Sequence, residues 1–167
     1  YDRVFVIGHK TLDADAFGAT FGIYKIAKLL GKESYMIFDE RSIDLTVDRI
    51  YNSIKRDYVG LLDDFITPSH ALHILDDKTL LMIVDCQSDF LLVEPKLAKK
   101  AKHIGIIDHH RQGEGSINKT EFYYSSTSAS SSVELIVELL EFFEKELTFD
   151  ALEATWMLLG IIVDTNN

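Results

Sequence analysis

Three short apolar segments constrain the fold of this chain most strongly. They lie at residues 4–7, 80–84 and 104–107, and each is continuous rather than alternating with polar residues. Continuous runs of this length are typical of strands buried on both faces of a parallel sheet. A weaker strand is expected at residues 34–38. The chain therefore has the strand pattern of a mostly parallel sheet that is covered on both sides.

The segments between these strands have the features of helices. Residues 15–30 carry apolar residues at helical spacing and are followed by Gly31, a residue type that commonly ends helices. Residues 44–56 are amphipathic. Three more helices are expected from the residue types at their starts. One begins at Thr67 with Pro68 and reaches about residue 75, one begins at Ser131 with Glu134 and reaches about residue 143, and one begins at Asp150 with Glu153 and reaches about residue 163. This alternation predicts an α/β fold with a mostly parallel sheet flanked by helices.

The chain is acidic, with 27 Asp and Glu residues against 17 Lys and Arg residues and a formal net charge of −10. Because affinity for long nucleic acids comes mainly from Lys and Arg, this balance argues against a long nucleic acid as partner. The single cysteine, Cys86, excludes an internal disulfide and fits a reducing compartment. No apolar run reaches transmembrane length and no signal peptide is visible, so we expect a cytoplasmic domain without membrane contact of its own.

Acidic residues and histidines follow each buried strand and the last helix. In chain order, they are His9, Asp13, Asp15, Asp85, Asp108, His109, His110 and Asp164. Ligands of open α/β sheets gather beyond the carboxyl ends of the strands, so we expect these side chains to meet at one edge. Carboxylates that lie this close together repel each other unless cations neutralise them. Few Lys or Arg residues lie nearby in the sequence, which favours metal ions as the cations.

The donor set narrows the choice of metal. Oxygen and nitrogen donors without thiolates favour Mn²⁺ or Mg²⁺, although Zn²⁺, Co²⁺ and Fe²⁺ also use them. There are more candidate ligands than one ion needs, so we expect two ions about 3.5–4 Å apart that share a carboxylate. Such a pair suits the hydrolysis of phosphate esters, because it activates water and stabilises the phosphoryl oxygens. Neither a Ser-His-Asp arrangement nor a Gly-rich phosphate loop is evident in the sequence.

These residues resemble the four motifs of the DHH family of phosphoesterases. Within that family the chain is most similar to the GdpP-type cyclic-di-AMP phosphodiesterases, and the similarity runs over essentially its whole length. The motif residues here are His9, Asp13 and Asp15, then Asp85, then Asp108-His109-His110, and finally Asp164. Further similar stretches are GHK at 8–10, DHHR at 108–111, residues 129–131 and GIIVDT at 160–165.

The resemblance implies a role for each motif residue. His9 and Asp13 would hold one metal ion, Asp15, His109 and Asp164 would hold the other, and Asp85 would bridge both. His110 would contact the phosphate or the attacking water, Arg111 would add positive charge to the phosphate site, and Asp108 would orient a neighbouring histidine. The implied cofactors are two divalent ions, with Mn²⁺ first among them. The implied reaction converts cyclic di-AMP into linear pApA.

Two positions depart from the family pattern. Leu12 stands where the family usually has Pro, which alters a turn but no ligand. Residues 86–88, Cys-Gln-Ser, stand where the family commonly has Thr-His-Arg-Pro, so a cationic or imidazole contact beside the site is missing.

The family also has a second, C-terminal DHHA1-type domain, which this sequence lacks. We therefore interpret residues 1–167 as the DHH catalytic domain of a longer protein. We expect this fragment to bind metal but to hydrolyse its substrate only weakly by itself. For the full-length protein, the family implies anchoring in the cell membrane and formation of a homodimer.

Other functions fit the same residues. The metal site could serve a nanoRNA or pAp phosphatase, or a family II inorganic pyrophosphatase, so the expected partner is a cyclic dinucleotide or a short nucleotide. A long-strand exonuclease is disfavoured by the acidic balance of the chain. Alternatively, the altered segment at residues 86–88 marks a degenerate domain that binds a nucleotide without hydrolysing it.

Overall fold

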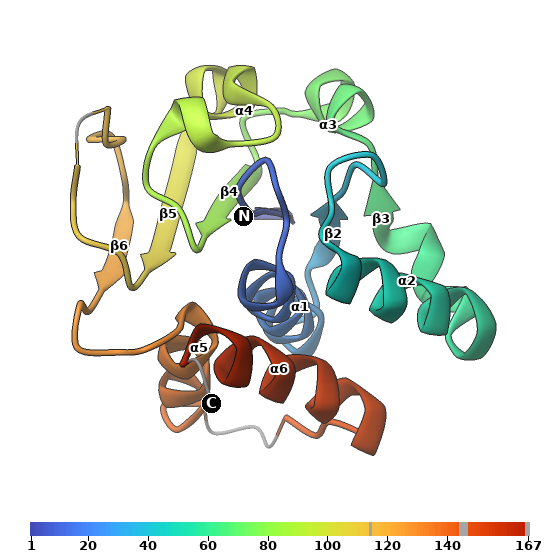
Figure 1. Ribbon diagram of the computed structural model, residues 1–167. Coiled ribbons are helices and arrows are strands. Elements are labelled where there is room, and N and C mark those ends of the chain that lie inside the picture. Colours follow the sequence, from blue (N-terminus) through green and yellow to red (C-terminus); the bar gives the residue numbers. More distant parts are fainter. Residues whose placement is uncertain (114, 144–146, 166–167) are drawn as a thin grey trace.

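A six-stranded sheet forms the centre of the molecule in the computed structural model, which describes residues 1–113, 115–143 and 147–165 (Figure 1). The strand order is β3-β2-β1-β4-β5-β6, and every neighbouring pair is parallel. The strands are β1 (Arg3–Ile7), β2 (Glu33–Ile37), β3 (Phe65–Ile66), β4 (Thr79–Val84), β5 (His103–Asp108) and β6 (Phe122–Ser125). The predicted α/β fold is confirmed.

Helices cover both faces of the sheet (Figure 1). They are α1 (Ala14–Leu29), α2 (Leu45–Asp57), α3 (Pro68–Ile74), α4 (Pro95–Lys100), α5 (Ser132–Leu140) and α6 (Ala151–Asp164), with two short 3₁₀ turns, η1 (Val59–Asp64) and η2 (Asp89–Leu91). One face carries α1, α2, α5 and α6, and the other carries α3 and α4. Alternate strand residues serve the two layers: Val4 and Val6 pack on the first, and Phe5 and Ile7 on the second. Both faces are therefore buried, as the continuous apolar runs require.

A close approach of two helices brings the last helix of the described chain against the first. Gly160 of α6 lies against the start of α1, where an added Cβ atom would be 2.9 Å from the Ala14 carbonyl oxygen and 3.0 Å from Asp15 Cα. A larger residue at this position would separate the helices. Asp164 is one turn further along α6, so this packing carries it to the first turn of α1.

Most of the predicted elements are present, with shifted ends. Gly31 follows α1 with a φ of +72°, in the left-handed region that favours glycine. The Asp150–Glu153 capping box opens α6. Ser131 caps α5 as expected, but the Glu134 carboxylate accepts a hydrogen bond from the Ser130 N–H and not from that of Ser131, as a capping box would require. The helix ends at Leu140 rather than near residue 143. The short elements β3, β6 and α4 were not predicted.

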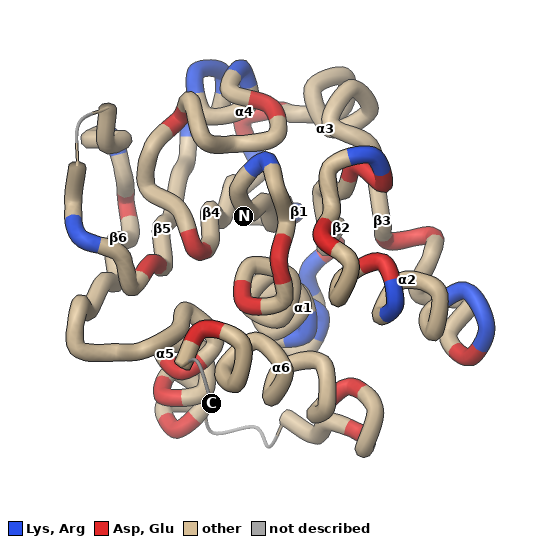
Figure 2. Tube along the Cα trace, viewed as in Figure 1, with Lys and Arg blue, Asp and Glu red and all other residues tan. Residues whose placement is uncertain are grey.

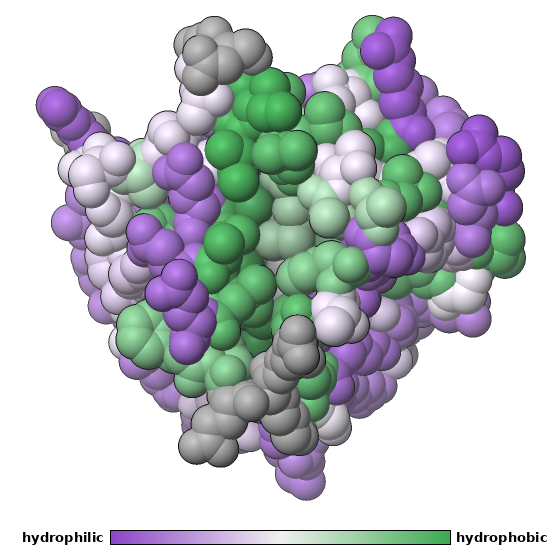
Figure 3. All heavy atoms as spheres, turned by 90° about the horizontal axis from the view of Figure 1, so that it is seen from below, coloured by the Kyte–Doolittle hydropathy of each residue, from purple (hydrophilic) through white to green (hydrophobic). Residues whose placement is uncertain are grey.

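Apolar side chains also gather on the outer face of α5 and α6 (Figure 3). Exposed members of this group are Val137, Leu158, Ile162 and Val163, together with Phe142 in the turn after α5. The inner side of α6 buries Trp156 and Met157 against α1, which accounts for the high apolar content of that helix. Of the helices in the described ranges, none combines the length and the apolar character that crossing a membrane requires.

Candidate metal centre

The predicted ligands come from the three central strands of the sheet. The strands β1, β4 and β5 are neighbours, and their carboxyl ends lead directly to His9, Asp85 and His109. The first turn of α1 and the last residue of α6 add three aspartates to the same edge. Acidic positions from segments far apart in the sequence therefore lie near one another at this edge (Figure 2).

One group of ligands is built around His9. Its Nε2 atom lies 3.3 Å from Asp13 Oδ2 and 3.4 Å from Asp85 Oδ2. Asp13 is the N-cap of α1, and its other oxygen accepts a hydrogen bond from Ala16 N–H at 3.0 Å. The cap fixes the carboxylate, while Oδ2 remains directed toward His9. The three ligand atoms lie within 4.8 Å of one another, which is compatible with one metal ion.

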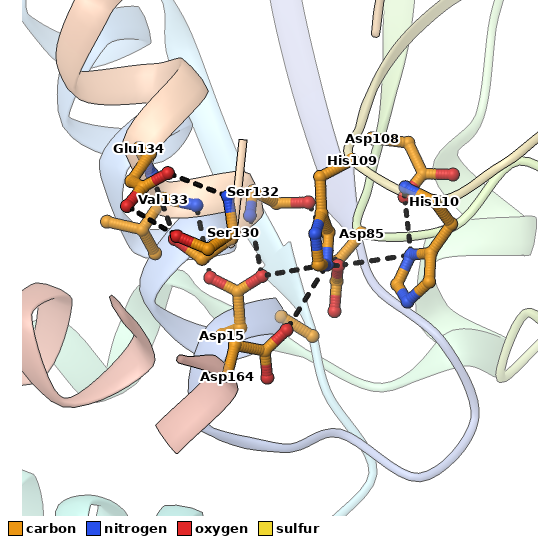
Figure 4. Close-up of polar contacts among 12 residues, drawn as sticks. Asp15, Asp85, Asp108, His109, His110, Ser130, Ser132, Val133, Glu134 and Asp164 are labelled. Atoms are coloured by element: carbon orange, nitrogen blue, oxygen red, sulfur yellow. Dashed lines mark hydrogen bonds and ion pairs between the residues drawn. The ribbon is translucent and has the colours of Figure 1, made fainter. Parts of the chain in front are cut away.

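A second group is built around His109. Its Nε2 atom lies 3.2 Å from Asp164 Oδ2, 3.3 Å from Asp85 Oδ1 and 3.8 Å from Asp15 Oδ2 (Figure 4). Ligand atoms of Asp15, His109 and Asp164 again lie within 4.8 Å of one another. Asp85 presents Oδ1 to this group and Oδ2 to His9, so its carboxylate stands between the two groups. This is the placement that a bridging ligand needs.

His110 and Asp108 form a pair beside these groups. His110 Nδ1 lies 2.8 Å from Asp108 Oδ1, and the Asp108 carboxylate is fully buried. Donation from Nδ1 fixes the ring and leaves Nε2 available for a partner. Nδ1 is also 3.6 Å from Asp85 Oδ1, so His110 borders the second group. His110 and Arg111 both line the open cleft in front of the two groups.

The backbone of Asp85 is itself unusual. Its φ of +56° makes it the only residue other than glycine with a positive φ in the described parts of the chain. A left-handed conformation costs a non-glycine residue on the order of 1 kcal/mol or more. The Asp85 N–H is held by the Ile107 carbonyl at 2.9 Å, which secures this turn at the end of β4. Strain of this kind concentrates at functional sites, which supports a functional role for Asp85.

The start of α5 supplies contacts that the sequence analysis did not identify. The N–H groups of Ser132 and Val133 donate to the two Asp15 oxygens at 2.7 and 3.1 Å, and Ser132 Oγ donates to Asp85 Oδ1 at 2.9 Å (Figure 4). A helix N-terminus stabilises a carboxylate through its free N–H groups and its dipole. The predicted helix start at Ser131 was the available signal, but the sequence gives no sign of its distant partners.

Gln87 occupies the segment that departs from the family pattern. Its amide nitrogen donates to the His110 carbonyl at 3.0 Å, and its amide oxygen accepts from Tyr123 Oη at 2.8 Å. The side chain therefore braces the loop after β5. The neighbouring Cys86 is buried, and burial raises the pKa of its thiol to about 11. A thiol with this pKa is protonated at neutral pH, and Cys86 belongs to neither group of ligands.

The pKa values of the clustered side chains are shifted from their usual values. Burial and the Asp85 charge raise the pKa of Asp15 to about 8, against the stabilising N–H groups of Ser132 and Val133. Burial opposes the protonation of His9, but Asp13 and Asp85 raise its pKa to about 10. Contact with Asp85 raises the pKa of His109 to about 9. Asp85 shows the opposite shift: burial would raise its pKa, but His109 and His9 hold it below the usual value. In the absence of metal cations, the negative charge of the carboxylates is thus balanced by protons bound to His9, His109 and Asp15.

These residues fit divalent metal ions. The buried Nε2 atom of His109 lies near three carboxylates, yet it makes a well-formed hydrogen bond with none of the residues the structure describes. Such an atom is satisfied when a metal ion lies between it and the oxygens. The donors are carboxylate oxygens and imidazole nitrogens, which suit Mn²⁺ and related ions. Proton release from the histidines and from Asp15 would accompany metal binding.

The fold and this cluster define a class of protein. Residues 3–161 match the family described as "DHH family, N-terminal domain", so the chain belongs to the DHH family, whose phosphoesterases are metal-dependent. Over 165 residues it is 43% identical to the cyclic-di-AMP phosphodiesterase GdpP of Bacillus subtilis (strain 168), covering 99% of this chain and 25% of that protein. It is 32% identical over 166 residues to the cyclic-di-AMP phosphodiesterase PdeA of Listeria monocytogenes serotype 1/2a (strain 10403S), with 99% and 25% covered.

Two further facts come from these comparisons. The chain spans about a quarter of the length of these curated relatives. Its fold is similar to the crystal structure of an exopolyphosphatase-related protein from Bacteroides fragilis, with a TM-score of 0.72 and 16% identity, covering 99% of this chain and 46% of that one. The resemblance to the DHH family that the motifs indicated is confirmed.

Proposed function

We propose that this domain hydrolyses a phosphodiester bond of cyclic di-AMP to give pApA, with water activated between two divalent metal ions. The observation that carries the proposal is the position of Asp85, whose two oxygens face two separate groups of ligands. The names of relatives at 43% and 32% identity support the choice of cyclic di-AMP as substrate. When bound, the metal ions supply hydroxide near neutral pH and positive charge for the phosphoryl oxygens.

The two groups support the ligand assignment. His9 and Asp13 would hold one ion, Asp15, His109 and Asp164 would hold the other, and Asp85 would contact both. All six donors are oxygen or nitrogen atoms, and Mn²⁺ suits them. The N–H groups of Ser132 and Val133 favour the ionised form of Asp15 against the effects of burial and the Asp85 charge, and they orient its carboxylate toward the second group.

The remaining site residues act on the substrate. Asp108 accepts a hydrogen bond from His110 Nδ1–H and raises the pKa of that ring, so in its protonated form the opposite nitrogen, Nε2–H, donates to a phosphoryl oxygen or orients the attacking water. Arg111 adds positive charge to the phosphate site from the wall of the same cleft. Because phosphoryl transfer builds negative charge on oxygen, both contacts become stronger as the reaction proceeds.

The domain is one part of the active protein in this proposal. Its relatives are about four times longer than this chain, since it spans 25% of each. We infer that residues 1–167 bind metal but need the remainder of the protein for full turnover. Anchoring in the cell membrane and homodimer formation belong to that longer protein.

The test is hydrolysis of cyclic di-AMP by the full-length protein with Mn²⁺, followed by chromatographic detection of pApA. His109→Ala should lower turnover by about 100-fold or more, because it removes a ligand and leaves buried carboxylates unpaired. The matched control is His70→Ala, at an exposed histidine of α3 that belongs to neither group of ligands. Equal turnover by wild type and His109→Ala would remove the proposal.

A second function within the same family is favoured by one observation. Residues 86–88 include no cationic side chain, and the Gln87 amide is engaged at both ends, so this segment offers neither a cation nor a free amide to the phosphate. Faster hydrolysis of pAp, a nanoRNA or inorganic pyrophosphate by the full-length protein would favour this second function. Metal binding without hydrolysis of any of these substrates would instead support a domain that only binds a nucleotide.

A further inference from the structure

The cleft in front of the metal ligands is larger than two ions require. Its volume is about 660 Å³, within the range of roughly 300–1,000 Å³ that is usual for small-molecule sites. A water molecule takes up only about 30 Å³ in the liquid, so two ions that are coordinated largely by protein side chains and keep a few waters leave most of the space free. The cleft can therefore hold a substantial organic group next to the ions.

Two consecutive apolar residues, here called the apolar wall, line this cleft together with the carboxylates and imidazoles of the ligand groups. They are Phe90 and Leu91, which are 54% and 38% exposed. The cleft otherwise presents polar side chains, so an exposed aromatic ring here indicates a ligand with a flat apolar part. We propose that Phe90 is the platform on which a nucleobase of the substrate stacks while the adjoining phosphate lies at the metal centre. This inference rests on the proposed function, because it takes the metal centre as the phosphate site.

The backbone of this wall is fixed to the loop that carries His9. Lys10 N–H donates to the Leu91 carbonyl at 2.6 Å, and His9 pairs with Leu92 in an antiparallel bridge. Leu92 is buried beneath the turn. The position of Phe90 is thereby coupled to the position of a proposed metal ligand, so a stacked base would have a defined distance from the phosphate.

The ring of Phe90 also has a defined support. It packs by one edge against Gly115, where an added Cβ atom would lie 2.6 Å from Phe90 Cε1. Gly115 has a φ of +75°, so a side chain there would be strained as well as obstructed. The ring is thus held at its edge while about half of the residue, which lines the cleft, remains exposed. Stacking on a ring that is already positioned loses little conformational entropy.

Two cations in the cleft complete the requirements for a nucleotide. Lys10 and Arg111 line it, and neither forms an ion pair with any residue in the ranges 1–113, 115–143 and 147–165. In a chain with a net charge of −10, unpaired cations beside a metal centre favour an anionic ligand. A nucleoside phosphate combines the anion and the flat ring, whereas a free phosphate or pyrophosphate would use only the cations and the metals.

The test compares AMP with ribose 5-phosphate, which lacks only the base. Dissociation constants are measured by titration calorimetry on the full-length protein with Mn²⁺. Base–aromatic stacking contributes about 1–3 kcal/mol, so wild type should prefer AMP by about 5- to 150-fold. Phe90→Ala should reduce this preference to about threefold or less without changing the affinity for ribose 5-phosphate. Phe90→Trp should retain the preference, and Phe142→Ala is the matched control because Phe142 is 81% exposed outside the cleft.

Three results would overturn the platform. They are no preference for AMP in wild type, an unchanged preference in Phe90→Ala, or an equal loss of both affinities. The last result would show that Phe90 packs against another part of the longer protein and supports the cleft as a whole. Hydrolysis of cyclic di-AMP is measured in a separate assay. If the protein prefers AMP but does not hydrolyse cyclic di-AMP, the proposed function is wrong and the role of Phe90 in stacking is retained.

Discussion

Ser132 Oγ donates a hydrogen bond to Asp85 Oδ1 at 2.9 Å, although the two residues are 47 positions apart in the sequence. Both side chains are buried, and the N–H of the same serine donates to Asp15. The first turn of α5 therefore holds one carboxylate that stands between the two ligand groups and one that belongs to the second group. A helix that contributes no ligand of its own fixes the geometry of the centre.

Replacing Ser132 with Ala should weaken metal binding without unfolding the domain. The variant removes the donor to Asp85 while the backbone contacts to Asp15 remain. Loss of a contact that orients a ligand typically costs about 10- to 100-fold in metal affinity. Titration with Mn²⁺ followed by calorimetry measures the change. The control is Ser131→Ala, which removes the N-cap of α5 and should cost about 1 kcal/mol of stability with little effect on affinity. Equal affinities for wild type and Ser132→Ala would contradict the assigned role.

Replacing Asp85 with Asn should reduce the number of bound ions more than replacing Asp13 with Asn. Asn is similar in shape and tolerates the φ of +56° at this position, so the backbone turn is retained. Asp85 faces both groups of ligands, whereas Asp13 faces only the group around His9. Elemental analysis of the protein after dialysis against Mn²⁺ should find fewer than one ion per chain for Asp85→Asn and about one for Asp13→Asn. The same stoichiometry for both variants would show that Asp85 is not shared.

The parts of the fold that the sequence predicts are those with a strong local signal. The strands β1, β4 and β5 are buried on both faces, so their apolar runs are continuous, and the Asp and His residues after them must share an edge once the strands are parallel. The short strand β3 and the edge strand β6 bury less, and Phe122 and Tyr123 in β6 remain exposed. Their sequences therefore lack the pattern that marks a central strand.

The parts of the site that sequence analysis missed depend on distant contacts. Ser132 is chemically ordinary, and its importance arises only because α5 begins beside residues 117 and 47 positions earlier in the chain. Gln87 likewise acquires its role through Tyr123 and the His110 carbonyl. Propensity and spacing describe neighbours along the chain, so they identify candidate ligands more readily than the residues that orient those ligands.

Without metal, the stability of the domain should fall as the pH rises from about 6.5 to 8. The pKa values of His9 and His109 are raised from 6.5 to about 10 and 9, and that of Asp15 is raised from 3.8 to about 8. The folded chain therefore holds more protons than the unfolded chain throughout this window. The lowered pKa of Asp85 adds no slope there, because Asp85 is ionised in both states.

Each retained proton contributes a slope of at most about 1.4 kcal/mol per pH unit. The stabilisation from the two histidines is complete below pH 6.5 and is lost as the pH rises through their folded values. Urea denaturation after treatment with a chelator measures the slope. Saturating Mn²⁺ should reverse its sign, because metal binding releases these protons and becomes tighter at higher pH. A flat profile in chelator would show that His9, His109 and Asp15 do not retain these protons in the folded chain.

Replacing Gly160 with Ala should impair the centre from a distance. The added methyl group would lie 2.9 Å from the Ala14 carbonyl oxygen and 3.0 Å from Asp15 Cα, both backbone atoms, so α6 must move away from α1. Overpacking of this kind costs about 1–3 kcal/mol, and here it also displaces Asp164, which lies one turn further along α6. We expect a lower melting temperature and about a tenfold loss of affinity for Mn²⁺, since a shift of one ligand lengthens its contact with the metal.

The matched variant is Gly60→Ala, where an added Cβ meets nothing within 4 Å and metal affinity should be unchanged. A Gly160→Ala protein that loses stability but binds Mn²⁺ as tightly as wild type would contradict the prediction, because it would show that the packing of α6 against α1 does not set the position of Asp164.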